Sequence, residues 1–215
     1  MERMKENLKR FLETQRGKLN LPEQIRISHE ITQGVAFLHQ LTPPMVHRDL
    51  NDKNVMFTFD GVVKIGDFGQ SKLKTGFYLK TTAPGMVSFM PPEALRHGYA
   101  KYDESLDVFS LGVLMLSIGT QHPPSSDLTG ICVIPEVERR AKDLEKMSDS
   151  HPMKPFILLC LSEGPEKRPK AVELVIKLSK LEEVRVTSLH NIACISLHTH
   201  VYIYFSYLDC YSILT

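Results

Sequence analysis

One segment of this 215-residue chain, LDVFSLGVLMLSI at residues 106–118, limits the possible folds more than any other. Its side chains are apolar on nearly every face of a helix, and a helix of this kind has to be buried on all sides. The segment is too short to cross a bilayer, so it predicts a helix at the centre of a globular core. Other elements must therefore surround it.

Several amphipathic segments have the apolar spacing of helices that can cover such a core. The first has Met4, Leu8, Phe11 and Leu12 at helical spacing and ends near Gly17. The second runs from about Pro22 to Leu41. Three more follow in the second half of the chain, at residues 135–147, 155–161 and 170–181. The expected fold class is mainly α, a helical bundle with one small β-hairpin beside it.

The hairpin is predicted between two β-rich runs, VMFTF at 55–59 and VVKI at 62–65. An Asp-Gly pair at 60–61 joins them, and this pair is a strong signal for a two-residue turn. Counted outward from such a turn, Asn54 lies opposite Asp67. Directly opposed side chains have Cβ atoms about 4.5–5.5 Å apart, so these two side chains are expected to be neighbours.

An amide oxygen and a carboxylate held this close form a site for a hard cation such as Mg²⁺. Asp49, five residues before Asn54, brings a second carboxylate to the same end of the hairpin. One carboxylate is then available to hold a metal ion and the other to accept a proton. A plainer alternative stays open, because an Asn opposite an Asp also occurs in ordinary turns with satisfied side chains.

A long region without sustained periodicity, residues 66–93, separates the hairpin from the central helix. It contains several Gly, Pro, Ser and Thr residues and is predicted to form one long loop. A loop of this length inside a compact domain is usually functional.

Five sequence elements, in the family's order, resemble the C-terminal lobe of protein kinases. HRDLNDKN at 47–54 is similar to the catalytic loop, and DFG at 67–69 is similar to the metal-binding loop. PPE at 91–93 resembles the APE motif, and DVFSLGV at 107–113 resembles the buried central helix. Arg168 lies where the family keeps an arginine that pairs with the APE glutamate.

The resemblance implies a kinase C-terminal lobe over residues 1–184, followed by an apolar tail of uncertain order at 185–215. The starting segment, MERMKENLKRFL, resembles the hinge and the helix after it. Only 46 residues precede His47 and no GxGxxG motif occurs, so the N-terminal lobe is expected to be missing. Such a chain is expected to be inactive or weakly active by itself.

By resemblance, the chain is an enzyme that transfers the γ-phosphoryl group of ATP to a protein hydroxyl, with ATP and Mg²⁺ as cofactors. Asp49 would orient the hydroxyl and take its proton, and Lys53 would be a basic residue of the catalytic loop. Asn54, also a catalytic-loop residue, would hold Mg²⁺ together with Asp67. The nucleotide-binding candidates are Met56, Asp67, Glu2 and Met4.

The resemblance also implies regulation by phosphorylation. Arg48 can clamp a phosphate group, so phosphorylation of the long loop is expected to control activity. Phe68 would set whether Asp67 points inward. The candidate acceptors in the loop are Tyr78, Thr81 and Thr82.

Four residues have structural roles by resemblance. His47 belongs to the catalytic-loop motif, and Asp107 would bind the backbone of that loop from the central helix. Glu93 and Arg168 would pair and pin the end of the long loop to the lobe. If the pair is buried, removing one partner would cost about 3–5 kcal/mol.

The acceptor amino acid is left open by three departures from the common patterns. Asn51 and Met86 lie where Ser/Thr kinases usually have a lysine and a threonine, and Lys53 lies where many tyrosine kinases have a basic residue. TTAPGMVSFMPPEAL at 81–95 is most similar to tyrosine-kinase-like kinases, which mostly phosphorylate Ser and Thr. The departure at Met86 is compatible with a loss of activity.

Two functional classes therefore remain, a piece of an active signalling kinase and a catalytically inactive lobe that acts as a binding or scaffold module. A third is a piece tethered to a membrane by the tail, but Asn191, His198 and Asp209 argue against a span there. The net charge of +1 gives no basis for nucleic-acid binding. The four scattered cysteines favour reduced thiols and a cytoplasmic location.

Overall fold

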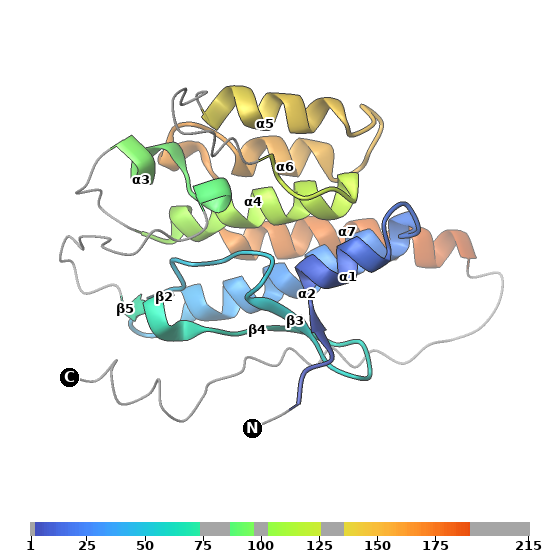
Figure 1. Cartoon of the computed structure of the whole chain (residues 1–215), viewed down its shortest axis with the longest axis horizontal. Coiled ribbons are helices and arrows are strands. Elements are labelled where there is room, and N and C mark those ends of the chain that lie inside the picture. The colour runs from blue at the N-terminus through green and yellow to red at the C-terminus, as the bar shows by residue number, and fades with distance from the viewer. Residues whose placement is uncertain (1–2, 74–86, 97–102, 126–135, 190–215) are drawn as a thin grey trace.

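The central helix of the fold is α4 (Glu104–Thr120). The structure is a computed structural model, and it describes residues 3–73, 87–96, 103–125 and 136–189. The side chain of Asp103 caps the start of α4 by accepting a hydrogen bond from Ser105 N at 3.0 Å. Every residue from Leu106 to Ile118 is buried. The predicted core helix is confirmed, and it has other helices on both sides (Figure 1).

Further helices pack around α4. On one side lie α6 (Lys154–Cys160) and, beyond it, α5 (Glu136–Glu145), and on the other side lie α2 (Leu21–Gln40) and α7 (Ala171–Leu189) (Figure 1). Between α4 and α6 the backbones approach closely, because a Cβ added at Gly112 would lie 2.6 Å from Cys160 Cβ. No helix in the described parts of the chain is long and apolar enough to cross a membrane.

Helix α2 begins at Leu21, next to the start predicted near Pro22. Two reciprocal hydrogen bonds cap its first turn. Asn20 Oδ1 accepts a hydrogen bond from Glu23 N at 3.0 Å, and Glu23 Oε2 accepts one from Asn20 N at 3.3 Å. This reciprocal pair satisfies two backbone donors that the helix itself leaves free. At its other end the helix stops at Gln40, one residue before the predicted Leu41.

Two small antiparallel sheets lie beside α2. In the first, β1 (Glu6–Asn7), β3 (Val55–Phe57) and β4 (Val63–Ile65) pair in the order β1-β3-β4. The second pairs β2 (Met45–Val46) with β5 (Lys72–Leu73). The predicted β3–β4 hairpin is confirmed, and β1 adds a strand that the sequence pattern does not predict.

The register of the hairpin differs from the prediction. Val55 pairs with Ile65, and Thr58 N donates to Val62 O at 3.0 Å, so three residues rather than two form the loop. The third of them, Gly61, has φ +83°, the left-handed residue that commonly ends a three-residue hairpin loop. Asn54 therefore lies opposite Gly66, and the predicted direct pairing of Asn54 with Asp67 is wrong. A one-residue change of register moves every side chain to the other face of the strand.

The first helix also begins later than its apolar spacing suggests. Helix α1 (Leu8–Thr14) is capped by Asn7, whose Oδ1 accepts from Arg10 N at 3.0 Å. The preceding residues form β1 instead, because Lys5 N donates to Phe57 O at 2.8 Å and extends the sheet. This pairing brings the N-terminal segment alongside β3.

Short elements interrupt the region expected to form one loop at 66–93. Its start contains the 3₁₀ turn η1 (Phe68–Gln70) and β5, and its end contains η2 (Val87–Phe89) and the first residues of α3 (Pro92–Arg96). A further 3₁₀ turn, η3 (Pro165–Lys167), precedes α7. Residues 74–86 lie outside the described part, and so do the three predicted phosphorylation sites, Tyr78, Thr81 and Thr82.

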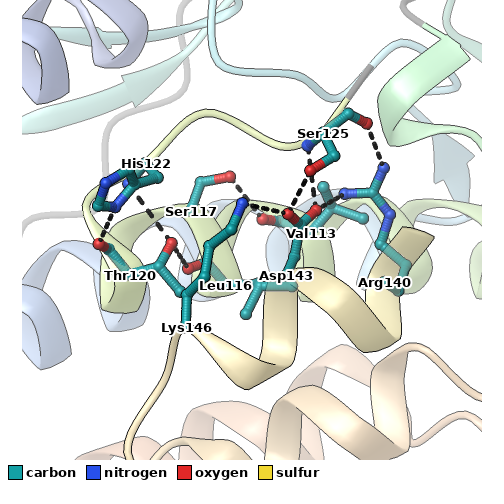
Figure 2. A network of polar contacts seen from close by, with 9 residues as sticks. All are labelled: Val113, Leu116, Ser117, Thr120, His122, Ser125, Arg140, Asp143 and Lys146. Carbon is teal, nitrogen blue, oxygen red and sulfur yellow. Dashed lines mark hydrogen bonds and ion pairs between the residues drawn. The ribbon is translucent and has the colours of Figure 1, made fainter. Parts of the chain in front are cut away.

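A buried polar network fixes the segment after α4 to α5 (Figure 2). Asp143 on α5 accepts hydrogen bonds from Ser125 N at 3.0 Å, from Arg140 at 3.0 Å and from Lys146 at 2.9 Å. Arg140 in turn donates to Ser125 O at 3.1 Å. Burial raises the pKa of Asp143, but hydrogen bonds from Ser125 and Lys146 outweigh it and leave the pKa below its ordinary value of 3.8.

Candidate active site

The loop between β2 and β3, which carries HRDLNDKN, is fixed to the central helix by one carboxylate. Asp107 on α4 is fully buried, and its two oxygens accept the backbone N–H groups of His47 at 2.8 Å and Arg48 at 2.9 Å. His39 Nε2 on α2 donates to the same carboxylate at 2.9 Å. Burial raises the pKa of Asp107, but the hydrogen bond and charge of His39, with further help from the loop, bring it below 3.8. The predicted contact of Asp107 with the loop backbone is present.

Asp49 and Asn54, two of the predicted catalytic residues, are in direct contact. Asn54 Nδ2 donates to the Asp49 carbonyl at 2.8 Å and to Asp49 Oδ2 at 3.1 Å. Asn51, to which the sequence pattern assigns no role, donates to the other carboxylate oxygen, Asp49 Oδ1, at 3.0 Å. Asp49 is half-buried, Asn54 is buried, and the predicted Lys53 is exposed.

Asp67 reaches the same loop through its neighbour, Gly66. Gly66 N donates to Asn54 O at 2.9 Å, and His47 Nε2 donates to Gly66 O at 3.0 Å. Asp67 follows directly and is exposed, and its Oδ1 accepts a long hydrogen bond of 3.4 Å from Gly69 N. Asp67 therefore follows the residue that pairs with Asn54, and the predicted direct opposition of the Asn54 and Asp67 side chains is absent.

Phe68 and His47 form the floor beneath this junction. Phe68 is buried, and its ring centroid lies 5.2 Å from that of His47. Ser71 Oγ donates to His47 O at 3.3 Å from the far side of η1. The start of the DFG segment is thus held against the catalytic loop by both packing and hydrogen bonds.

The backbone is locally unusual at two positions of this site. Arg48 has φ +71° and Asp67 has φ +60°, which is the left-handed region that non-glycine residues seldom adopt. Each such residue costs about 1 kcal/mol or more and persists only where the surroundings impose it. Strained residues of this kind concentrate at functional sites. Here one of them, Arg48, directly precedes Asp49, and the other is Asp67 itself.

The side-chain oxygens of Asn54 and Asp67 are suited to a hard cation whose other ligands are waters or phosphate oxygens. Asn54 uses its Nδ2 on Asp49, which leaves the amide oxygen available as a ligand, and the Asp67 carboxylate is exposed. Within the described segments there is no group of three or more His, Cys, Asp and Glu side chains that could hold a metal alone. Mg²⁺ is commonly bound by one or two carboxylates with waters and substrate phosphates, so these residues fit Mg²⁺ bound with a phosphate ligand.

Two of the other predicted nucleotide-binding residues, Met56 and Met4, lie on β3 and just before the segment that pairs with it. Met56 on β3 is half-buried, and its Cε would lie 2.3 Å from a Cβ added at Gly66, so this side chain covers Gly66. Met4, half-buried, immediately precedes the segment that pairs with β3. The third candidate, Glu2, lies outside the described residues.

Glu93 and Arg168 form the predicted pair. The two guanidinium nitrogens donate to the two carboxylate oxygens at 2.6 and 2.8 Å, which is a bidentate contact. The Arg168 side chain is 0% exposed and that of Glu93 is 22% exposed. Arg168 also donates to the carbonyls of Ser162, Ser105 and Glu163, and its charge lies 5.0 Å from the centre of the Phe109 ring. The pair joins α3 to the region before α7.

Comparison with known proteins gives this arrangement a family. The model of the protein kinase domain matches residues 1–177. The chain belongs to the protein kinase family.

The kinase chain is similar to several curated serine/threonine kinases. It is 32% identical to serine/threonine-protein kinase CTR1 of Arabidopsis thaliana over 179 residues, which are 81% of this chain and 22% of that protein. It is 32% identical to mitogen-activated protein kinase kinase kinase 3 of the same plant, over 74% of this chain and 26% of that protein. It is 33% identical to serine/threonine-protein kinase WNK2 of Mus musculus, over 80% of this chain and 8% of that protein. The chain therefore spans about a quarter or less of the length of these relatives.

Two residues of this chain make contacts that the sequence pattern does not reveal. His39 lies on a helix face like many surface histidines, and only its contact with Asp107 shows that it supports the loop that carries HRDLNDKN. Asn51 differs from the lysine usual in Ser/Thr kinases, which marks the position without showing what the amide binds. The spacing of two residues from Asp49 is the one available signal, because Asn side chains often bond to backbone two residues away.

Proposed function

We propose that this chain carries the phosphoryl-transfer residues of a protein kinase that phosphorylates Ser and Thr hydroxyls of proteins in signal transduction. The observation that carries the proposal is the contact of Asp49 with Asn54, together with the backbone bond that brings Asp67 to the same loop. A proton acceptor and two oxygen ligands for a cation then lie at one edge of the lobe. The names of two of the similar proteins, the serine/threonine-protein kinases CTR1 and WNK2, support Ser and Thr as acceptors.

In this proposal each residue has one task in the transfer. The acceptor oxygen forms a bond to the γ-phosphorus while the bond from that phosphorus to the β-phosphate oxygen breaks, and ADP leaves. Asp49 orients the hydroxyl and takes its proton. Asn54 and Asp67 would hold Mg²⁺, which supplies neutralisation of the phosphate charge. Lys53 adds an exposed positive charge to the same loop.

The nucleotide base and the regulatory loop complete the proposal. Met56 and Met4 would cover one face of the adenine ring from β3 and the segment before β1, with Glu2 in the adjoining hinge-like segment. Arg48 would bind a phosphate on Tyr78, Thr81 or Thr82 and so couple the loop to the catalytic site. ATP and protein substrates are the proposed partners, in the cytoplasm.

A second function, a catalytically inactive lobe that acts as a binding or scaffold module, is favoured by one specific observation. Met86 lies where Ser/Thr kinases usually have a threonine, and this departure is compatible with a loss of activity. These 215 residues contain no GxGxxG motif to cover the phosphates of a nucleotide, so we expect them by themselves to transfer phosphate slowly or not at all.

Titration with Mg²⁺–ATP tests the binding part of the proposal. We expect weak binding that perturbs the backbone NMR resonances of Asn54, Asp67 and Gly69, and that disappears in Asp67→Asn. Asp60→Asn is the matched control, because it removes a carboxylate from the opposite end of the same hairpin. Perturbations that are unchanged in Asp67→Asn, or the absence of any perturbation at millimolar nucleotide, would count against the proposed site.

A transfer assay with radiolabelled ATP and a generic protein substrate separates the two functions. Slow transfer that is lost in Asp49→Ala supports the kinase function. No transfer, combined with Asp67-dependent nucleotide binding, favours the binding module. Rapid transfer that survives Asp49→Ala would contradict the proposal that Asp49 orients the acceptor hydroxyl and takes its proton.

A further inference from the structure

Asn51 lies between the proposed proton acceptor and the proposed metal ligand and contacts both. It is only 3% exposed, although it belongs to a loop. Its amide nitrogen donates to the Asp49 carbonyl at 2.9 Å and to Asp49 Oδ1 at 3.0 Å. Its amide oxygen accepts from Lys53 N at 2.9 Å and from Asn54 N at 3.3 Å. Both the nitrogen and the oxygen of this buried amide therefore bond to residues of the same loop.

The nitrogen side of Asn51 acts on the carboxylate of Asp49. Asn54 Nδ2 bonds to the other oxygen of that carboxylate at 3.1 Å, so the group is held from both sides by neutral amides. Hydrogen bonds to an ionised acceptor are about twice as strong as neutral ones, and burial of Asn51 protects this one from competition with water. The carboxylate keeps lone pairs for an acceptor hydroxyl, because each oxygen offers two.

The oxygen side of Asn51 acts on the backbone of Asn54. By accepting the N–H groups of the two residues that follow Asp52, it closes a tight turn in the loop. This turn directs the Asn54 side chain back to Asp49. Asp49, Asn51 and Asn54 therefore form a closed ring of hydrogen bonds in which Asn51 contacts both of the others.

We propose that Asn51 is a positioning residue that holds the Asp49 carboxylate and Asn54 in one fixed arrangement. The inference rests on the proposed function, since it concerns the same site. It also gives a reason for the departure of this chain from the lysine usual in Ser/Thr kinases. At this position the chain supplies geometry through a neutral amide and supplies no positive charge.

Two substitutions at Asn51 separate this role from simple support of the loop. Asn51→Ser keeps a hydroxyl oxygen that can accept a backbone N–H of the turn but is too short to reach Asp49, and it adds no charge beside that carboxylate. Asn51→Ala removes both interactions. If Asn51 positions Asp49, both variants should lower kcat by about 10- to 100-fold with KM for ATP changed less than about 2-fold. If Asn51 supports only the loop, Asn51→Ser should keep a kcat near that of the unchanged chain, and the proposal would be overturned.

A spectroscopic readout decides the question even if the chain transfers no phosphate. The side-chain NH₂ resonances of Asn51 should be shifted and protected from exchange in the unchanged chain. Asp49→Ala should remove both features from the proton that is bonded to Oδ1, while the other proton stays bonded to the carbonyl of residue 49. Asp60→Asn, at the far end of the hairpin, is the control and should leave them unchanged. An NH₂ signal that does not respond to Asp49→Ala refutes the positioning role. A response without any phosphoryl transfer supports the positioning role and counts against the kinase activity of the chain.

Discussion

Removal of Glu93 should destabilise the lobe more than its place near the surface suggests. Glu93→Ala leaves the Arg168 guanidinium in a site where its side chain is 0% exposed, so the charge cannot recover its hydration. Breaking a buried pair in this way costs about 3–5 kcal/mol. Three carbonyl contacts to Arg168 remain, which places the expected loss near the lower end of that range.

The second substitution of the pair should then cost less than it would in the unchanged chain. Arg168→Met keeps much of the packing on Phe109 and removes the stranded charge, but it also removes the donor to the carbonyls of Ser162, Ser105 and Glu163. The loss in Glu93→Ala with Arg168→Met should therefore be smaller than the sum of the two single losses. Urea unfolding followed by far-ultraviolet circular dichroism measures these free energies, and the chain has no tryptophan to report by fluorescence. Strictly additive losses from the two substitutions would refute the argument that a buried, unpaired charge is the main cost.

Three further predictions concern other parts of the lobe. Gly112→Ala should destabilise by about 1–3 kcal/mol in urea unfolding, although Ala usually favours a helix, because the new methyl group would overlap Cys160 between α4 and α6. Asp52→Asn should raise the unfolding free energy at pH 7 by about 1 kcal/mol, since burial raises the pKa of Asp52 above 3.8, Lys9 and Lys53 offset this only in part, and Oδ1 has no hydrogen-bond partner among the described residues. That gain should shrink as the pH falls, because the Asp52 carboxyl group takes up its proton at a higher pH in the folded chain than in the unfolded one. Because the pKa of Asp143 is lowered, its contribution to the unfolding free energy is complete above about pH 5 and is lost as the pH falls below 3.8. The unfolding free energy of Asp143→Asn should therefore fall less between pH 5 and pH 3 than that of the unchanged chain, in acid titrations followed by circular dichroism.

The main helices could be predicted from the sequence because burial imposes a period on them. The continuous apolar run at 106–118 identifies α4, and the Asn20 and Glu23 pair marks the start of α2. The start of α1 could not be placed, because the apolar spacing from Met4 continues through residues that pair with β3 instead. Such pairing depends on a strand about 50 residues away, and no local pattern reports it.

The residues of the candidate site could be predicted from the sequence, but their arrangement in space could not. An Asp-Gly pair is compatible with both two- and three-residue hairpin loops, because both place the glycine in the left-handed region. The two loops differ at Asp60, which a two-residue type I′ turn would also place at positive φ and which does not adopt it here. The backbone at Asp60 therefore decides whether Asn54 faces Asp67 or Gly66. Asn51 and His39 escaped prediction for a different reason, because their roles come from hydrogen bonds to Asp49 and Asp107 and not from periodicity.

The attachment of the catalytic loop to Asp107 ties its motion to that of the whole lobe. The amide protons of His47 and Arg48 are bonded to a carboxylate that belongs to the most deeply buried helix. They should therefore exchange with solvent about as slowly as the amides of α4 itself, whereas loop amides ordinarily exchange through local opening. A substitution that shifts α4, even one distant from Asp49, would displace the catalytic loop with it.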